Sequence, residues 1–206
     1  MLACCTLVLS CSKGVSYRIA GTWENGEGKK IYLSEIVGNK EFRAVDSAVV
    51  APDFTFLLKG NVDRVQKMVL VYNTDKRKEI IVDGEPMNVM FEETTKEWKG
   101  KPTTSVTVTC TGNKEQEFLE KGSSLKTTIS FMQLGKMMAA SQADYSDPVA
   151  VDSLKRVFAL LDSSLMAAVN NYMDSARNSY ASTYFFESHL MDNYTFEEVQ
   201  GFYNKL

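Results

Sequence analysis

The chain has 206 residues, of which 44% are hydrophobic and 24% are charged, and its formal net charge is −3. These values are ordinary for a globular protein and allow one large domain or two small ones. Because the sequence contains no basic block, neither nucleic acid nor an anionic lipid surface is an expected partner.

The N-terminus has the pattern of a bacterial lipoprotein signal. Residues 1–10 are uncharged and mostly apolar, which is too short a run to cross a bilayer but suits the apolar part of a signal peptide. Val8, the small Ser10 and Cys11 resemble a lipobox, in which the cysteine carries the lipid after cleavage. We therefore expect a signal peptide at 1–10, lipidation of Cys11 and a tether at 11–15. The alternative is an apolar N-terminal strand with a chance cysteine.

The four cysteines do not predict a disulfide. Cys4 and Cys5 lie in the expected signal peptide. Cys11, the first residue after cleavage, would carry the lipid and would not be a free thiol. Cys110 is then the one thiol of the mature chain, and no Cys-x-x-Cys redox centre can form. It alternates in phase with Val106 and Val108, so we expect it to be a small buried residue.

Residues 16–112 show the two-residue apolar alternation of β-strands. Eight short strands are expected, separated by turn signals such as Asn25-Gly26 and Asp83-Gly84, which we interpret as hairpins. The polar residues 92–102 are expected to form a loop. This pattern predicts an all-β domain, either a sandwich or barrel-like.

In residues 113–206 the apolar spacing changes to three and four residues, which predicts helices. In the most regular stretch, Asp147 is expected to cap a helix that has Pro148 at its first position. Gly122 weakens the helix before it and predicts a break there. The whole chain is thus predicted to be α+β, with the β domain followed by a helical hairpin and short helices.

The C-terminal end is rich in aromatic residues. Thr195 and Glu198 form a capping box that starts a final helix. Core packing is the first interpretation of the apolar residues in this region, because aromatic side chains dominate cores. The alternative is an interface for a protein partner or a second copy, and its candidate residues are Tyr184, Phe185, Phe186, Phe196, Val199 and Phe202.

Four short segments carry a resemblance to a known family: YRIAG at 17–21, KIYL at 30–33, VDSA at 45–48 and DFTF at 53–56. They resemble an N-terminal domain of unknown function in Bacteroidota lipoproteins, which precedes thioredoxin-like domains of the alkyl hydroperoxide reductase and thiol-disulfide oxidoreductase type. The resemblance implies a β domain at the cell envelope, usually linked to the thioredoxin-like domain by a helical segment. Redox chemistry belongs to that later domain, which we do not expect in this chain, so no catalytic residue carries over.

Other candidate sites have simpler explanations. The glycine- and lysine-containing residues 26–30 do not match a P-loop and are expected to form a turn. His189 is the single histidine and has no second metal ligand nearby in the sequence, so no metal site is expected. Asp46 and Ser47 point to opposite faces of a strand, which argues against a triad with His189.

We therefore predict a non-catalytic cell-envelope lipoprotein that serves as a binding or assembly module, with no cofactor. Ser12-Lys13-Gly14 lacks the acidic residues that usually follow the cysteine of outer-face lipoproteins, so the protein is expected to face the periplasm. One alternative is an accessory part of a thiol-disulfide oxidoreductase. A weaker one is a hydrolase with an unrecognised carboxylate site, for which the acidic pairs are Asp83 with Glu85 and Glu92 with Glu93.

Overall fold

The computed structural model describes residues 14–38, 41–74, 76–191 and 193–206. Within these residues the chain divides after Asn113 into two compact units, a β unit and a helical unit. The predicted α+β class, with an all-β part followed by helices, is confirmed. The predicted signal peptide and Cys11 lie outside the described residues. No helix among the described residues is both long and apolar enough to span a membrane.

The β unit is a sandwich of two four-stranded sheets with the strand orders β4-β1-β7-β8 and β3-β2-β5-β6. β1 and β7 pair in parallel, and the other pairs are antiparallel. The strands are β1 (Val15–Trp23), β2 (Lys30–Val37), β3 (Glu41–Val49), β4 (Thr55–Val62), β5 (Gln66–Asn73), β6 (Lys76–Val82), β7 (Met87–Trp98) and β8 (Lys101–Thr111).

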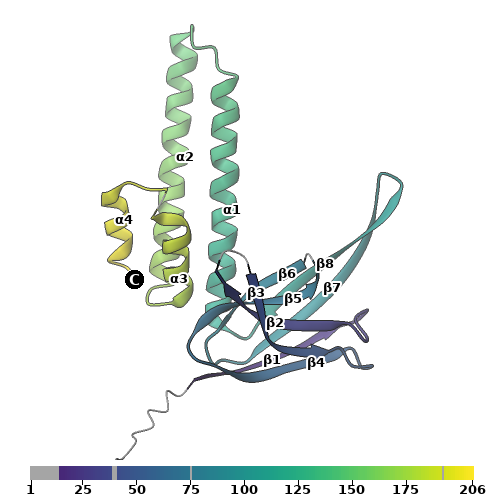
Figure 1. Ribbon diagram of the computed structural model, residues 1–206. Helices are drawn as coiled ribbons and strands as arrows, with labels where there is room; N and C mark the ends of the chain where they lie inside the picture. The colour runs from purple at the N-terminus through teal and green to yellow at the C-terminus, as the bar shows by residue number, and fades with distance from the viewer. Residues whose placement is uncertain (1–13, 39–40, 75, 192) are drawn as a thin grey trace, which may run out of the picture. The chain divides into compact units, whose positions relative to one another are not determined.

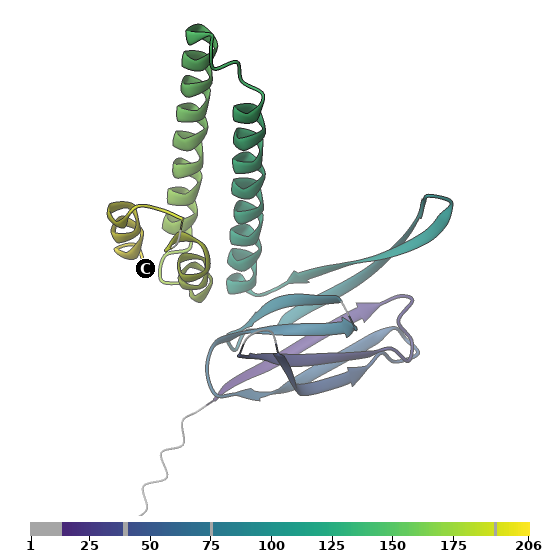
Figure 2. The same cartoon turned by 45° about the horizontal axis from the view of Figure 1, so that its top comes forward.

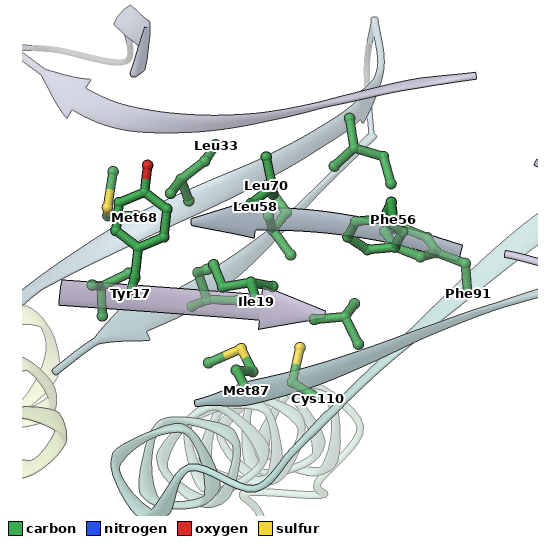
Figure 3. Close-up of a cluster of buried hydrophobic side chains, with 14 of the residues drawn as sticks. Tyr17, Ile19, Leu33, Phe56, Leu58, Met68, Leu70, Met87, Phe91 and Cys110 are labelled. Carbon is green, nitrogen blue, oxygen red and sulfur yellow. The ribbon is translucent and has the colours of Figure 1, made fainter. Parts of the chain in front are cut away.

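The core of the sandwich lies between the two sheets, where alternate residues of each strand point inward. Figure 3 shows Ile19 of β1, Leu58 of β4 and Leu70 of β5 gathered there. Cys110 of β8 belongs to the same cluster and is 5% exposed, so its predicted burial is confirmed.

Two turns that were predicted to be hairpins connect strands of different sheets. Asn25-Gly26 follows β1 and precedes β2, and Asp83-Gly84 lies between β6 and β7, so each turn crosses from one sheet to the other. The hairpin prediction is wrong at both positions. The dipeptides Asn-Gly and Asp-Gly indicate a tight local turn. They do not determine whether the strands on either side of the turn pair with each other.

Residues 92–102, predicted to be a loop, belong to a long β-hairpin formed by β7 and β8, which we call the arm. Its pairing continues to Trp98 and Lys101 at the tip. The turn residues Lys99 and Gly100 have φ of 51° and 75°, as a two-residue hairpin turn of type I′ requires. The loop prediction is wrong because residues 94–98 and 101–105 of the arm are exposed on both faces and mostly polar, which removes the apolar alternation that marks strands.

The helical unit consists of an antiparallel hairpin and a short C-terminal set of helices (Figure 1). The Asp147 carboxylate accepts a hydrogen bond from the Val149 amide at 2.9 Å, and Thr195 and Glu198 form the predicted capping box. Both helix starts are thus confirmed. The elements are α1 (Lys114–Ser141), α2 (Pro148–Ser175), α3 (Tyr180–Phe185), the π-helical turn η1 (Phe186–Leu190) and α4 (Phe196–Tyr203).

The predicted break at Gly122 is absent, since α1 runs without interruption from Lys114 to Ser141. Gly122 is buried, and a Cβ atom there would lie 2.8 Å from the Tyr172 hydroxyl oxygen and 3.3 Å from Cδ2 of Phe185. The Tyr172 hydroxyl donates a hydrogen bond to the carbonyl of Phe118 at 3.1 Å. Glycine therefore occurs at this position because another helix approaches closely, and it does not end the helix.

Candidate interaction surface

The end of the hairpin beside α3 and α4 has a complete core. Tyr172 and Phe185 pack edge-to-face with their ring centroids 4.8 Å apart, and the Glu115 carboxylate accepts a hydrogen bond from the Ala181 amide at 2.9 Å. Lys205 ties the chain end to α2 through Asp174 at 3.0 Å. The buried apolar residues of the hairpin are Phe118, Leu119, Gly122, Ile129, Leu165, Val169, Tyr172 and Met173.

The other end of the hairpin, residues 130–164, has no buried residue. In both views of the fold, α3 and α4 lie beside the opposite end of the hairpin, away from the loop that joins α1 to α2 (Figures 1 and 2). Two helices alone cannot bury both of their apolar sides. The exposed large apolar residues of this loop-side half are Phe131, Leu134, Met137, Met138, Tyr145, Val149, Val157 and Leu160.

An apolar groove of about 590 Å³ runs between the two helices in the loop-side half, and we call it the hairpin groove. Small residues line much of it: Gly135, Ala139, Ala143, Ala150 and Ser153. Larger side chains border it, because residues three or four positions apart lie on the same side of a helix. The larger apolar side chains that line the groove are Met132 of α1 and Leu154, Val157, Phe158 and Leu161 of α2.

Charged residues of the hairpin lie mainly outside this groove. Lys136 reaches its edge, but its ammonium is paired with the Asp162 carboxylate at 2.6 Å. Arg156 pairs with Asp152, also at 2.6 Å, on a side of α2 that does not line the groove. The lining of the groove is therefore mainly apolar, with Lys136 and Asp144 as its charged residues.

The six residues predicted to form a C-terminal interface do not line the hairpin groove, and half of them are buried. Phe185, Phe186 and Phe202 are 4%, 6% and 2% exposed, so they fill its core. Tyr184 and Val199 are half-buried. Phe196 is 80% exposed and is the one fully accessible apolar residue of that set. Sequence reasoning missed the hairpin groove because an uncovered apolar stripe and a buried one have the same helical periodicity.

The polar residues singled out in the β unit have structural partners. The Asp46 carboxylate accepts a hydrogen bond from the Tyr17 hydroxyl at 3.0 Å, and burial together with this carboxylate raises the pKa of Tyr17 to about 12. Asp83 accepts hydrogen bonds from the Glu85 amide at 3.0 Å and from the Asn113 side chain at 2.6 Å. Both carboxylates thus stabilise local structure.

Glu92 and Glu93 lie on opposite faces of β7. Glu93 accepts hydrogen bonds from Lys29 at 2.5 Å and from the Trp23 indole at 2.9 Å, and the Lys29 contact is the main cause of its lowered pKa. Although they alternate along the strand, Glu92 and Glu93 both line one hollow, together with Glu24 and Asp53. The structure therefore brings this acidic pair to one hollow, where Glu93 is held by Lys29 and Trp23. Among the described residues, no group of three or more His, Cys, Asp and Glu side chains is placed to bind a metal ion.

His189 is buried in the helical unit without a hydrogen-bond partner for its Nε2 atom. Its ring lies beside Phe185, with ring centroids 5.4 Å apart. Burial, and to a smaller extent the charge of Lys126, lowers the pKa of His189 below its usual 6.5. The folded unit therefore favours the neutral imidazole.

The helical unit should lose stability when the pH falls below about 6.5. In that range the unfolded chain binds a proton at His189 that the folded chain does not, so unfolding becomes more favourable. Below the lowered pKa of the folded state this dependence should end. Urea unfolding followed by helical circular dichroism from pH 8 to pH 5 measures the effect. The variant His189→Phe should show a weaker pH dependence than the parent, and equal dependence in both would refute the role of His189.

Residues 17–119 match a family model described as "Domain of unknown function (DUF4369)", which covers half of the chain. The chain belongs to this family. The DUF4369 match begins in β1, spans the β unit and ends in the first turns of α1. It confirms the sequence resemblance at the level of a domain of unknown function. Searches of curated proteins and of solved structures find no match. The hairpin groove lies C-terminal to the DUF4369 match.

Proposed function

We propose that this chain is a non-catalytic, lipid-anchored protein of the Bacteroidota cell envelope that faces the periplasm and acts as an assembly module. Its copies associate through the hairpin groove. The observation that carries the proposal is the apolar hairpin groove within residues 130–164, where no residue is buried and many large apolar residues are exposed. Exposed apolar surface of this extent usually marks an interaction site.

A second copy of the chain fits this surface well. Two hairpins placed face to face form a four-helix bundle, in which each apolar side is covered by the other. Groove-lining apolar residues of one copy, such as Met132 and Val157, can enter the small-residue floor of the other, as knobs enter holes in coiled coils. Such a contact is symmetric, because each copy offers the same patch. The α2 part, residues 148–164, spans about 25 Å at ~1.5 Å per residue, enough for a modest interface.

A pair of Ala→Glu substitutions in residues 12–206, which include every described residue, tests this assembly. Ala139 lines the hairpin groove, whereas Ala159 is exposed on α2 near Lys155 and Asp162 and does not line it. Both positions are helical, so the substitutions have equal effects on helix propensity. A glutamate at 139 should abolish self-association, because a charge would be buried without a partner. A glutamate at 159 should leave the sedimentation coefficient as in the parent.

Either of two results would count against the hairpin groove as the interface. The Ala139→Glu variant could associate as strongly as the parent, or both variants could lose association to the same extent. Circular dichroism of each variant checks that the helical unit remains folded, so that a loss of association is not caused by unfolding.

The lipid anchor rests on the lipobox-like residues that end at Cys11. In the full chain, Cys11→Ala should remove the attachment site for lipid and shift the protein from the membrane fraction to the soluble fraction. Ser12→Ala is the matched control and should remain with membranes. A Cys11→Ala protein that sediments with membranes as the parent does would show that the anchor lies elsewhere or does not exist.

The second candidate is an accessory role beside a thioredoxin-like domain, which the four segments resembling thioredoxin-linked lipoproteins support. The one described thiol, Cys110, is buried in the sandwich core and gives this chain no accessible redox group of its own among the described residues. A Trp-Cys-x-x-Cys coding segment immediately after the codon for Leu206, in frame or in an adjacent gene, would favour this second role.

A further inference from the structure

A second hollow, of about 690 Å³, lies on the outer face of the sheet β4-β1-β7-β8, and we call it the sheet hollow. Its floor is Ala20 of β1, which pairs with Leu57 of β4 and with Asn88 of β7. The small side chain of Ala20 lies between larger neighbours and so leaves space above the sheet. Leu57 and Met90 are 43% and 44% exposed, which gives the hollow an apolar surface. Thr109 of β8 borders it.

Two cations meet at one end of the sheet hollow. Arg18 lines it, and Arg18 pairs directly across the β1–β4 ladder with Lys59. Both side chains point to the outer face, and within the described residues neither has an ion pair. Like charges directly opposite each other destabilise a pair of strands. An anion held between them would relieve the repulsion and form charge-assisted hydrogen bonds.

The opposite end of the sheet hollow is acidic. Thr22 and Met90 also border an adjoining hollow, which is lined by Glu24, Asp53 and Glu92. An anionic group would be repelled there and attracted at the Arg18 end. The outer face of this sheet therefore imposes one orientation on an anionic ligand, with its charged group at Arg18 and its remaining part over Ala20.

We propose that the sheet hollow binds a single-chain aliphatic carboxylate, such as a free fatty acid. The carboxylate lies between Arg18 and Lys59, and the alkyl chain runs over Ala20 and Leu57 toward Met90. From Arg18 to Thr22 the strand advances four residues, or about 13 Å at ~3.3 Å per residue, which suits a medium-length alkyl chain. The volume is within the range of small-molecule sites, about 300–1,000 Å³. This site is independent of the assembly through the hairpin groove.

Calorimetric titration of residues 12–206 with decanoate, decanol and acetate separates the contributions of the tail and the head group. Decanoate should bind most tightly, decanol should bind at least about tenfold more weakly, and acetate should give no measurable binding. The double variant Arg18→Gln with Lys59→Gln should weaken decanoate binding about tenfold and change decanol binding little. Ala20→Phe, which fills the floor, should weaken binding of both decanoate and decanol.

Two controls keep the result interpretable. The double Gln variant should unfold at a temperature no lower than the parent, because it removes a repulsive pair, so lost binding cannot be attributed to unfolding. Ala139→Glu, in the hairpin groove, should leave decanoate binding unchanged. Equal affinity for decanoate and decanol, or decanoate binding that survives Ala20→Phe but is lost in Ala139→Glu, would overturn the proposal.

Discussion

Replacing Trp23 with alanine should lower the free energy of unfolding of the β unit by about 3–5 kcal/mol, the usual cost of truncating a buried aromatic residue. Trp23 is 3% exposed and stacks on Phe91 with ring centroids 4.8 Å apart, and it packs edge-to-face with Tyr72 with ring centroids 6.1 Å apart. Its indole also donates to Glu93, which in turn binds Lys29. Truncation leaves a cavity and removes one of the two donors to the Glu93 carboxylate.

The second tryptophan supplies a matched control. Trp98, at the tip of the arm, is 68% exposed, so Trp98→Ala should change the free energy of unfolding by less than about 0.5 kcal/mol. Urea unfolding followed by strand circular dichroism measures both variants without depending on tryptophan fluorescence. If Trp23→Ala cost as little as Trp98→Ala, the aromatic cluster would not stabilise the sandwich.

Replacing Gly122 with leucine should destabilise the helical unit strongly, although leucine favours helices more than glycine does. The new Cβ would lie 2.8 Å from the Tyr172 hydroxyl oxygen, whose ring is buried and hydrogen-bonded to Phe118. The ring cannot move away without loss of that bond and of its contact with Phe185. Overpacking of this kind costs about 1–3 kcal/mol, occasionally more.

Gly135 lies in the same helix and tests the same substitution without the steric conflict. A Cβ at Gly135 would meet no atom within 4 Å. Gly135→Leu should therefore stabilise α1 by roughly 0.5–1 kcal/mol through helix propensity alone. The two variants should differ by about 2–4 kcal/mol in urea unfolding at a concentration where the chain is monomeric. Equal effects at the two positions would show that Gly122 is not a point of close packing.

The sequence predicted those features that depend on local periodicity and capping. Alternation predicted the strands of the β domain and the burial of Cys110, and Asp147 and Thr195 marked helix starts that the structure confirms. Short-range signals failed where a distant partner decides the outcome. The turn at Asn25-Gly26 is tight, but its flanking strands pair with β4, β7, β3 and β5 and do not pair with each other.

The candidate surfaces show the same limit. The hairpin groove and the sheet hollow depend on which apolar or small residues other elements leave uncovered, and no local pattern contains that information. Ala20 looks like an ordinary strand residue until the register places it beside Leu57 and Asn88. Arg18 and Lys59 are 41 positions apart in the sequence, so no basic block in the sequence predicts the cationic end of the sheet hollow.

The central claim is that copies of the chain assemble through the hairpin groove, and sedimentation equilibrium tests it most directly. The measurement uses residues 12–206 over the widest accessible concentration range, with Ala139→Glu and Ala159→Glu beside the parent. We expect the weight-average mass of the parent and of Ala159→Glu to rise from that of one chain toward twice that value, while Ala139→Glu stays at the mass of one chain. A parent that remains at the mass of one chain at its highest soluble concentration would contradict the proposed assembly.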